Sequence, residues 1–332
     1  MKYIAVILGT SVLAACGGGG GDSTAPAQSI STTAALTSAN QDVVAQDTAT
    51  AANVPLSSAE LLTGAQVTVD GVLFSMMHAQ ITKLPTYIAS LKANSTVTGA
   101  VESETWSCNY GGSLTATGTD ADNNGIVSSG DRVTLSSNGC IEAEGALSGS
   151  LDFVITNLSG DFGSTNYIAA MAITFNNFAV TSSQFSANVN GGMTFSTNAS
   201  GANTSTATVS TPSLAVSGTY AGATRTRTLT NYSATVQRRP DPTYNYVTSY
   251  SLSGFLTSSS ISSQTIAFST PTPLVTRSTS YYPSSGVMLI TGINNSKLRV
   301  TALSNTQVTE ELDANGDGTY ESTKTVSWNT LM

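Results

Sequence analysis

The chain has 332 residues, with 12 basic and 20 acidic side chains, a net charge of −8 and an isoelectric point near 4.5. This balance excludes nucleic acid as a partner, because binding phosphates requires a basic face. A single histidine excludes metal sites built from several histidines and argues against histidine-based triads. Charged residues make up only 10% of the chain, but an apolar content of 40% still supports a buried core.

The N-terminus has the pattern of an export signal. Lys2 precedes the apolar run from Tyr3 to Leu8, and small residues then lead to Leu13-Ala14-Ala15-Cys16. An apolar run this short, ending in small residues, is typical of a signal peptide and cannot cross a bilayer as a helix. Residues 1–15 are therefore predicted to be removed.

The sequence Leu-Ala-Ala-Cys resembles the lipobox of bacterial lipoproteins, and the glycines after it are similar to those of many proteobacterial outer-membrane lipoproteins. The resemblance implies diacylglycerol on the Cys16 thiol and an acyl chain on its new amine, which together anchor the chain in membrane lipid. Gly17 stands where aspartate commonly marks inner-membrane retention, so the resemblance implies the outer membrane, on its periplasmic or its surface face. The alternative is an ordinary secretory signal with an incidental cysteine.

The other two cysteines fit an oxidising compartment. With Cys16 lipidated, Cys108 and Cys140 remain as an even number. A disulfide between them would close a loop of about 33 residues and stabilise the fold by roughly 3–4 kcal/mol. The alternative is a pair of buried free thiols.

Two segments precede the predicted β domain. Residues 16–55 contain a five-glycine run and a Ser, Thr, Ala and Gln stretch without periodicity, which predicts a flexible tether. Residues 56–95 are predicted to form one or two helices, because Ser57 and Ser58 are suitable N-caps and apolar residues recur at helical spacing over 72–81. His78 lies here, and we interpret it as a packing or surface residue.

Residues 96–332 have strand patterns throughout. Leu151–Ile155, Ile168–Val180 and Leu214–Val216 are separated by Gly, Asn and Ser clusters, and Tyr244–Leu252 alternates like a half-buried antiparallel strand after a turn at Pro240–Pro242. We expect a mainly β fold: a long antiparallel meander of about 12–14 strands. Because flat open sheets rarely exceed about ten strands, it should form a sandwich or a curled, partly open barrel, with the helical segment packed on the sheet.

The loop at residues 120–131 resembles the twelve-residue calcium loops of EF-hands and dockerins. It has oxygen donors at positions 1, 3 and 5, glycine at position 6 and a carboxylate at position 12, as a hard cation requires. The candidate ligands are Asp120, Asp122, Asn124, Ile126 through its carbonyl, Ser128 through its hydroxyl or a water, and Asp131. Aspartate at position 12 departs from the EF-hand glutamate, but dockerin-like loops accept it.

A second acidic loop begins at residue 313. Its candidate ligands are Asp313, Asn315, Asp317, Thr319 and Glu321, but Lys324 occupies position 12, so the bidentate ligand is missing. Asp-Gly and Asn-Gly pairs are also common in hairpin turns, so the alternative at both loops is a solvated turn without metal. Structural calcium at these loops is the only cofactor that the sequence predicts.

A small basic and aromatic patch is a further candidate. Arg225 and Arg227 share one strand face and Arg238-Arg239 end the same strand, while Tyr244 and Tyr246 follow across the turn. Arginine beside tyrosine suits sugars or anionic groups. The alternative is that the arginines protect an edge strand from aggregation and the tyrosines belong to the core.

The motifs of nucleophilic, zinc-dependent and phosphate-binding enzymes do not occur in this sequence, so we do not expect an enzyme. The sequence predicts a membrane-anchored envelope lipoprotein with a non-catalytic binding or structural role, and a glycan or an envelope protein as its partner. One alternative is a lipid carrier whose half-barrel cavity holds an acyl chain. A lipid-tethered transmembrane barrel is disfavoured, because Ser and Thr occur on both strand faces.

Overall fold

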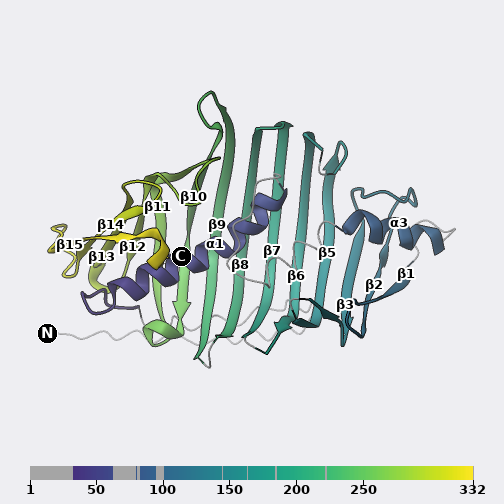
Figure 1. The fold of residues 1–332 in the computed structure, drawn as a ribbon, viewed down its shortest axis with the longest axis horizontal. Coiled ribbons are helices and arrows are strands. Elements are labelled where there is room, and N and C mark those ends of the chain that lie inside the picture. Colours follow the sequence, from purple (N-terminus) through teal and green to yellow (C-terminus); the bar gives the residue numbers. More distant parts are fainter. Residues whose placement is uncertain are drawn as a thin grey trace, which may run out of the picture. The chain divides into compact units, whose positions relative to one another are not determined.

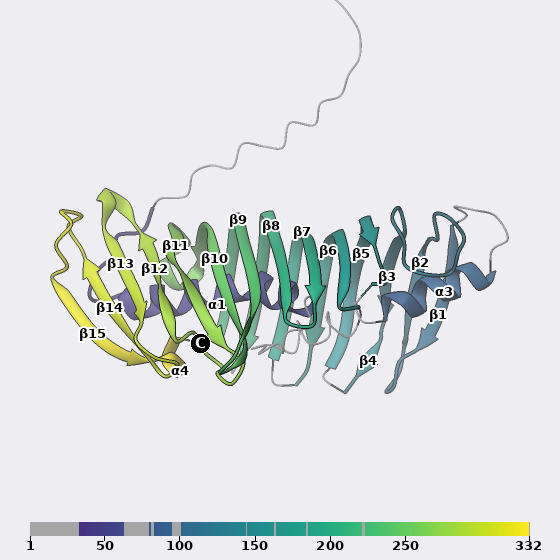
Figure 2. The same ribbon diagram turned by 90° about the horizontal axis from the view of Figure 1, so that it is seen from above.

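The computed structural model describes residues 33–62, 80, 83–94, 101–143, 145–162, 164–183, 185–220 and 223–331. Its fold is mainly β: one antiparallel sheet of 15 strands that is not closed into a barrel (Figures 1 and 2). Strands follow one another in chain order, except that the short β4 pairs only with β5. The predicted long, curled and open meander is confirmed, and the sandwich is not observed.

The sheet is built from hairpins of very different lengths. The short strands at its start are β1 (Glu102–Ser107), β2 (Ser113–Thr119), β3 (Arg132–Asn138) and β4 (Ile141–Glu142). The long central strands are β5 (Gly145–Ser159), β6 (Asn166–Thr181), β7 (Phe185–Gly201), β8 (Thr204–Tyr220), β9 (Ala223–Asp241), β10 (Asn245–Ser258) and β11 (Gln264–Arg277). The sheet ends with β12 (Ser285–Thr291), β13 (Lys297–Ala302), β14 (Gln307–Asp313) and β15 (Ser322–Ser327).

Alternating sequence gives the sheet one apolar and one polar face. In β10, Leu252 and Leu256 are buried while Ser251 is exposed, as the alternation predicts. The outer face carries rows of hydroxyls that bond across strands, as between Ser196 and Thr208 at 2.7 Å. Threonine suits a strand because its branched side chain packs well on a pleated surface.

The predicted turn before β10 was placed too early. Pro240 pairs with Tyr246 and Asp241 with Asn245, so both lie within the β9–β10 ladder, and the turn occupies the residues between Asp241 and Asn245. Asp241 Oδ1 accepts hydrogen bonds from the backbone N–H groups of Thr243 and Tyr244 at 2.8 and 2.9 Å, which stabilises that turn.

Bulges bend the long strands. The register between β5 and β6 shifts after Ser148, where Gly149 has a φ of +78°. A Cβ on Gly149 would lie 2.1 Å from the carbonyl oxygen of Asn177, so only glycine fits. Bulges increase local twist and bend a strand, which lets a sheet this long curl without closing.

Three α-helices are present in the described residues: α1 (Gln41–Leu62), α3 (Leu84–Asn94) and the single-turn α4 (Trp328–Leu331). Short 3-10 turns occur at η1 (Ser259–Ile261) and η2 (Ile293–Asn295). Helix α1 contacts β7 to β10 and β13, and α3 contacts β1 to β3 (Figure 1). Both helices pack on the sheet; α3 lies within the predicted helical segment of 56–95, whereas most of α1 precedes it.

The position of α1 corrects two sequence predictions. The tether was expected to reach residue 55, but Ala34 already donates a backbone hydrogen bond to Thr265 at 2.9 Å, and α1 begins at Gln41. Ser57 and Ser58 lie inside this helix and do not begin one. Alanines favour the helix intrinsically, and its packing on the sheet stabilises it.

The region after α1 is described only in part. Residues 72–79, including His78, lie outside the described residues, so the helix expected over 72–81 stays a prediction there. Helix α3 begins at Leu84 and carries Pro85 in its first turn, where a missing backbone N–H costs little.

A buried ion pair fixes the middle of α1 to the sheet. Asp47 is fully buried and accepts hydrogen bonds from Arg227 Nη2 at 2.6 Å, Arg227 Nε at 3.1 Å and Ser258 Oγ at 2.5 Å. Tyr232 donates its hydroxyl to the carbonyl of Ala52 at 2.9 Å, and complete burial raises the pKa of that phenol. Because α1 buries small side chains, these polar contacts determine where it sits.

A second polar cluster lies under the first turn of α1. Glu310 of β14 is buried, Lys324 Nζ lies 3.3 Å from its Oε2, and Gln41 Nε2 donates to the same oxygen at 3.4 Å. Lys324 also pairs with Asp42, so one ammonium group serves two carboxylates. Burial raises the pKa of Glu310 to about 7, and the Gln41 hydrogen bond opposes this shift.

Glu310 should make the protein less stable as the pH rises from about 4.5 to 7. In this window the folded protein retains a proton that the unfolded chain releases, so the free energy of unfolding falls, by at most about 3 kcal/mol. The change Glu310→Gln should remove this decrease, as measured by denaturant titrations between pH 5 and pH 8. Glu311→Gln is the matched control, because Glu311 pairs with Arg299 on the opposite face, and equal pH slopes in the two variants would contradict the prediction.

Candidate functional site

An apolar pocket of about 80 Å³ lies between α1, strands β10 to β13 and α4. We call it the aromatic pocket. It is lined by Ala49, Ala52, Asn53, Tyr250, Leu252, Leu274, Thr276, Tyr281, Tyr282, Pro283, Met288, Val300 and Trp328.

Trp328 forms one wall of the aromatic pocket. Its Nε1 donates to the carbonyl oxygens of Pro283 at 3.0 Å and Ser304 at 3.1 Å, which fixes the ring although α4 is only one turn long. Tyr282 stacks on Trp328 with ring centroids 6.1 Å apart and planes at 12°. Tyr281 packs edge-on against Tyr282 and stays 58% exposed, so it forms the rim.

The lining decides which chemistry the pocket can accept. None of its described lining residues is charged, and the polar atoms come from Asn53, Thr276 and the tyrosine hydroxyls. Buried charge without a partner is strongly unfavourable, so the pocket suits an uncharged apolar group. The sequence did not predict this site: Tyr281-Tyr282-Pro283 was its only local signal, and Trp328 joins it through the fold.

The first acidic loop connects β2 and β3, and the fold brings three of its predicted ligands together. Single carboxylate oxygens of Asp120, Asp122 and Asp131 lie within 4.8 Å of one another. Asp120 and Asp131 are buried, whereas the side chain of Ile126 is exposed.

Backbone N–H groups already bind these carboxylates. Asp120 accepts from Gly125 at 2.6 Å, and Asp131 accepts from Ala121 at 2.9 Å and from Ser128 at 2.7 Å. Burial raises the pKa of Asp131, and these hydrogen bonds partly oppose the shift. Asn124 uses its Oδ1 to accept from the Ile126 N–H at 2.6 Å, so its oxygen also has a partner within the loop.

The second acidic loop connects β14 and β15. Single carboxylate oxygens of Asp313, Asp317 and Glu321 lie within 4.8 Å of one another, and Asp313 is buried. The N–H of Thr319 and the side chain of Asn315 lower the pKa of Asp317. The fold thus gathers these three predicted carboxylates.

Lys324, at position 12 of the second loop, makes its ion pairs outside that loop. It binds Asp42 and Glu310, in the polar cluster under α1. The loop therefore lacks a carboxylate at position 12, as the sequence indicates.

The arginine and tyrosine patch is partly as predicted. The Arg238 guanidinium lies 4.5 Å from the centre of the Tyr246 ring, and Arg277, which the sequence did not single out, lies 4.6 Å from the Tyr244 ring. Arg227 forms the buried ion pair with Asp47 of α1, while Arg225 and Arg239 are exposed. Strand β9 lies inside the sheet, so these arginines do not protect an edge.

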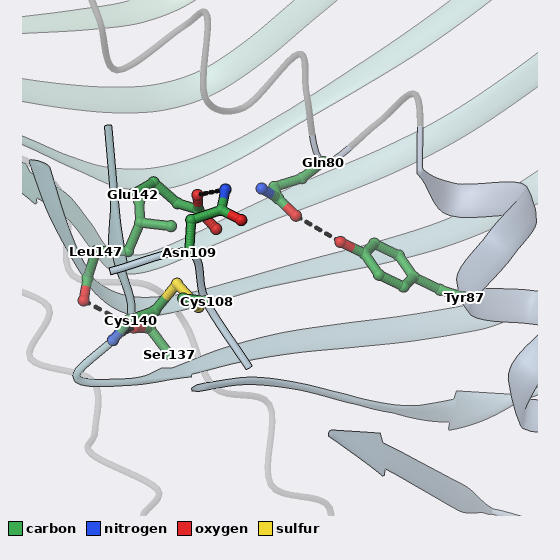
Figure 3. The surroundings of a disulfide bond; sticks show 8 residues. All are labelled: Gln80, Tyr87, Cys108, Asn109, Ser137, Cys140, Glu142 and Leu147. Carbon is green, nitrogen blue, oxygen red and sulfur yellow. Dashed lines mark hydrogen bonds between the residues drawn. A yellow bond between two sulfur atoms is a disulfide. The ribbon is translucent and has the colours of Figure 1, made fainter. Parts of the chain in front are cut away.

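The predicted disulfide is present and joins the end of β1 to the segment between β3 and β4 (Figure 3). The Cα atoms of Cys108 and Cys140 are 5.4 Å apart, and Cys140 is buried. Ser137 supports this corner: its hydroxyl donates to the carbonyl of Leu147 at 2.7 Å and accepts the backbone N–H of Cys140 at 3.3 Å.

Polar side chains surround the disulfide (Figure 3). Asn109 donates to Glu142 at 2.5 Å, and the Tyr87 hydroxyl donates to Gln80 Oε1 at 2.6 Å. Burial and then the charge of Glu142 raise the pKa of Tyr87 to about 12, so this phenol stays protonated at neutral pH. The surroundings are those of a structural bridge that ties the first strands together.

No family model, curated protein or solved structure matches this chain. Among the helices of the described residues, none has the length and apolar character needed to cross a membrane. Cys16 lies outside the described residues, so its lipidation stays a prediction from the sequence.

Removing the disulfide should destabilise the fold. The double variant Cys108→Ser/Cys140→Ser should unfold at lower denaturant concentration, with a loss of about 3–4 kcal/mol, because the unfolded chain regains the freedom of a closed loop. Cys16→Ser is the control that removes a thiol without removing the bridge. Two alkylatable thiols at positions 108 and 140 of the native, non-reduced protein would contradict the pairing.

Proposed function

We propose that this protein is a lipid-anchored envelope protein of the outer membrane with a non-catalytic binding role. The anchor rests on the lipobox that ends at Cys16 and on Gly17 after it. The binding role rests on the aromatic pocket, an uncharged concave site with an exposed tyrosine at its rim. Apolar concave sites with a few polar groups are the usual form of binding sites.

The hydrogen bond between Ala34 and the sheet supports a short connection between the sheet and the membrane. Ala34 is hydrogen-bonded to the sheet, so a tether that begins at Cys16 would end before Ala34, earlier than the predicted end at residue 55. A shorter connection holds the sheet closer to the bilayer, where lipids, envelope glycans and other envelope proteins are the available partners.

The alternative of a carrier that encloses a whole lipid has less support. Ligand sites usually have volumes of about 300–1,000 Å³, whereas the aromatic pocket has about 80 Å³. Helix α1 packs over the buried face of β7 to β10, where a half-barrel carrier would need an empty interior. The geometry favours a site that contacts only part of a ligand.

The anchor can be tested by fractionating membranes of a Gram-negative host that expresses the full chain. Cys16→Ser should move the protein from the membrane to the soluble fraction, because a chain without acyl groups keeps no stable anchor. Gly17→Asp is the matched control: it should stay membrane-bound but shift toward the inner membrane. Unchanged membrane partitioning of Cys16→Ser would reject the anchor.

We also propose that the two acidic loops bind structural calcium. The approach of three carboxylates within 4.8 Å of one another in each loop supports this, because a hard cation binds clustered oxygen ligands. Candidate ligands with side-chain oxygens are short residues on tight turns, which is the arrangement that a hard cation needs. At saturation, calcium would stabilise the folded protein by mass action.

Calcium at a hundred times its dissociation constant should raise the free energy of unfolding by about 2.7 kcal/mol per site, and the Tm by several degrees. Melting curves with millimolar calcium and with chelator measure this effect. Asp120→Asn or Asp313→Asn should reduce the shift, while the exposed Asp161→Asn should leave it unchanged. Equal Tm values with calcium and with chelator would reject structural calcium.

A further inference from the structure

The aromatic pocket exists because α1 presents very small side chains to a corner that bulky residues surround. Ala49 and Ala52 contribute only methyl groups to the wall, opposite Tyr250, Met288 and Trp328. Tyr232 and Asp47 fix the helix at this height above the sheet, so α1 cannot easily move inward to fill the space. The pocket is therefore a built cavity of a fixed size.

Its size selects among apolar groups. A cavity of about 150 Å³ binds benzene, and one of 80 Å³ is about half as large. The volume is therefore smaller than that of a cavity that holds a six-membered ring. A narrow hydrocarbon end suits a site of this volume better than an aromatic or sugar ring does.

The rim contacts the part of such a ligand that extends out of the pocket. Tyr281 is 58% exposed and packs against Tyr282, so it offers an aromatic surface outside the cavity for further carbons. The described lining carries no charge, so a charged or strongly polar end would stay in water beyond the rim.

We propose, building on the proposed anchored binding role, that the aromatic pocket binds the terminal carbons of an unbranched acyl chain and leaves the polar end of the lipid outside. Membrane lipid and the chain's own lipid at Cys16 are two sources of the same chemistry. In either case the pocket binds the end of an acyl chain and does not enclose a whole lipid.

The test uses straight-chain 1-alkanols from ethanol to octanol as probes and Trp328 as the reporter. The protein is the full chain with Cys16→Ser, which has no acyl anchor of its own, and with Trp106→Phe, which leaves Trp328 as the remaining tryptophan. Saturable changes in Trp328 fluorescence should appear, with affinity rising about fourfold per added carbon until the pocket is full, and more slowly after that. Cyclohexanol should bind more weakly than 1-hexanol.

Two variants separate the pocket from general hydrophobic adsorption. Ala52→Leu should fill the cavity and abolish the saturable response. Tyr281→Ala, at an exposed rim position, should leave short alcohols unaffected but weaken the longer ones. Tyr110→Ala, at an exposed tyrosine on the loop after β1, is the matched control and should change neither.

These experiments test binding by the aromatic pocket independently of the proposed lipid anchor at Cys16. No saturable response, the same response in Ala52→Leu and the control, or equal affinity for cyclohexanol and 1-hexanol would overturn it. If the lipidated wild type binds alkanols more weakly than the Cys16→Ser form, the chain's own lipid is the ligand, and equal binding indicates membrane lipid. Membrane partitioning is measured separately. The lipid anchor can therefore be rejected while alkanol binding is observed, and alkanol binding can be absent while the lipid anchor is supported.

Discussion

The need to cover one apolar face of a very long sheet shapes this molecule. Without a second sheet to pack against, the inward side chains of β7 to β10 are covered by α1, and those of β1 to β3 by α3. Because α1 offers mostly alanine to this face, apolar packing alone specifies its position weakly. The buried pair of Asp47 and Arg227 supplies that specificity, and the same placement leaves the aromatic pocket beside the helix.

The sheet could be predicted from sequence because its signals are local. Alternation along Tyr244–Leu252 identified both faces of β10, and hairpin connections make neighbours in sequence neighbours in space. The two remaining cysteines allowed only one pairing with each other, and the spacing of Asp120, Asp122 and Asp131 already brought their carboxylates close together. In each case the information lay within a short stretch of chain.

Features that depend on distant residues could not be predicted. Asp47 and Arg227 are 180 positions apart, and nothing near either residue indicates the other. Helix α1 was mistaken for tether because alanine, serine and threonine give little contrast between a buried and an exposed helix face. The aromatic pocket combines Ala52, Tyr281 and Trp328 from three separate segments, so it appears only when the sheet curls and the helices settle on it.

The order of the strands in the sheet determines which parts of the protein unfold together. Apart from the short β4, each strand pairs only with its neighbours along the meander, so the strands hold together pair by pair, as repeats do in a repeat protein. Helix α1 runs along the direction of the meander, across the strands, and contacts β7 to β10 and β13, so it ties the middle of the sheet together (Figure 1). The strands that α1 covers, β7 to β10, should therefore open as one cooperative block.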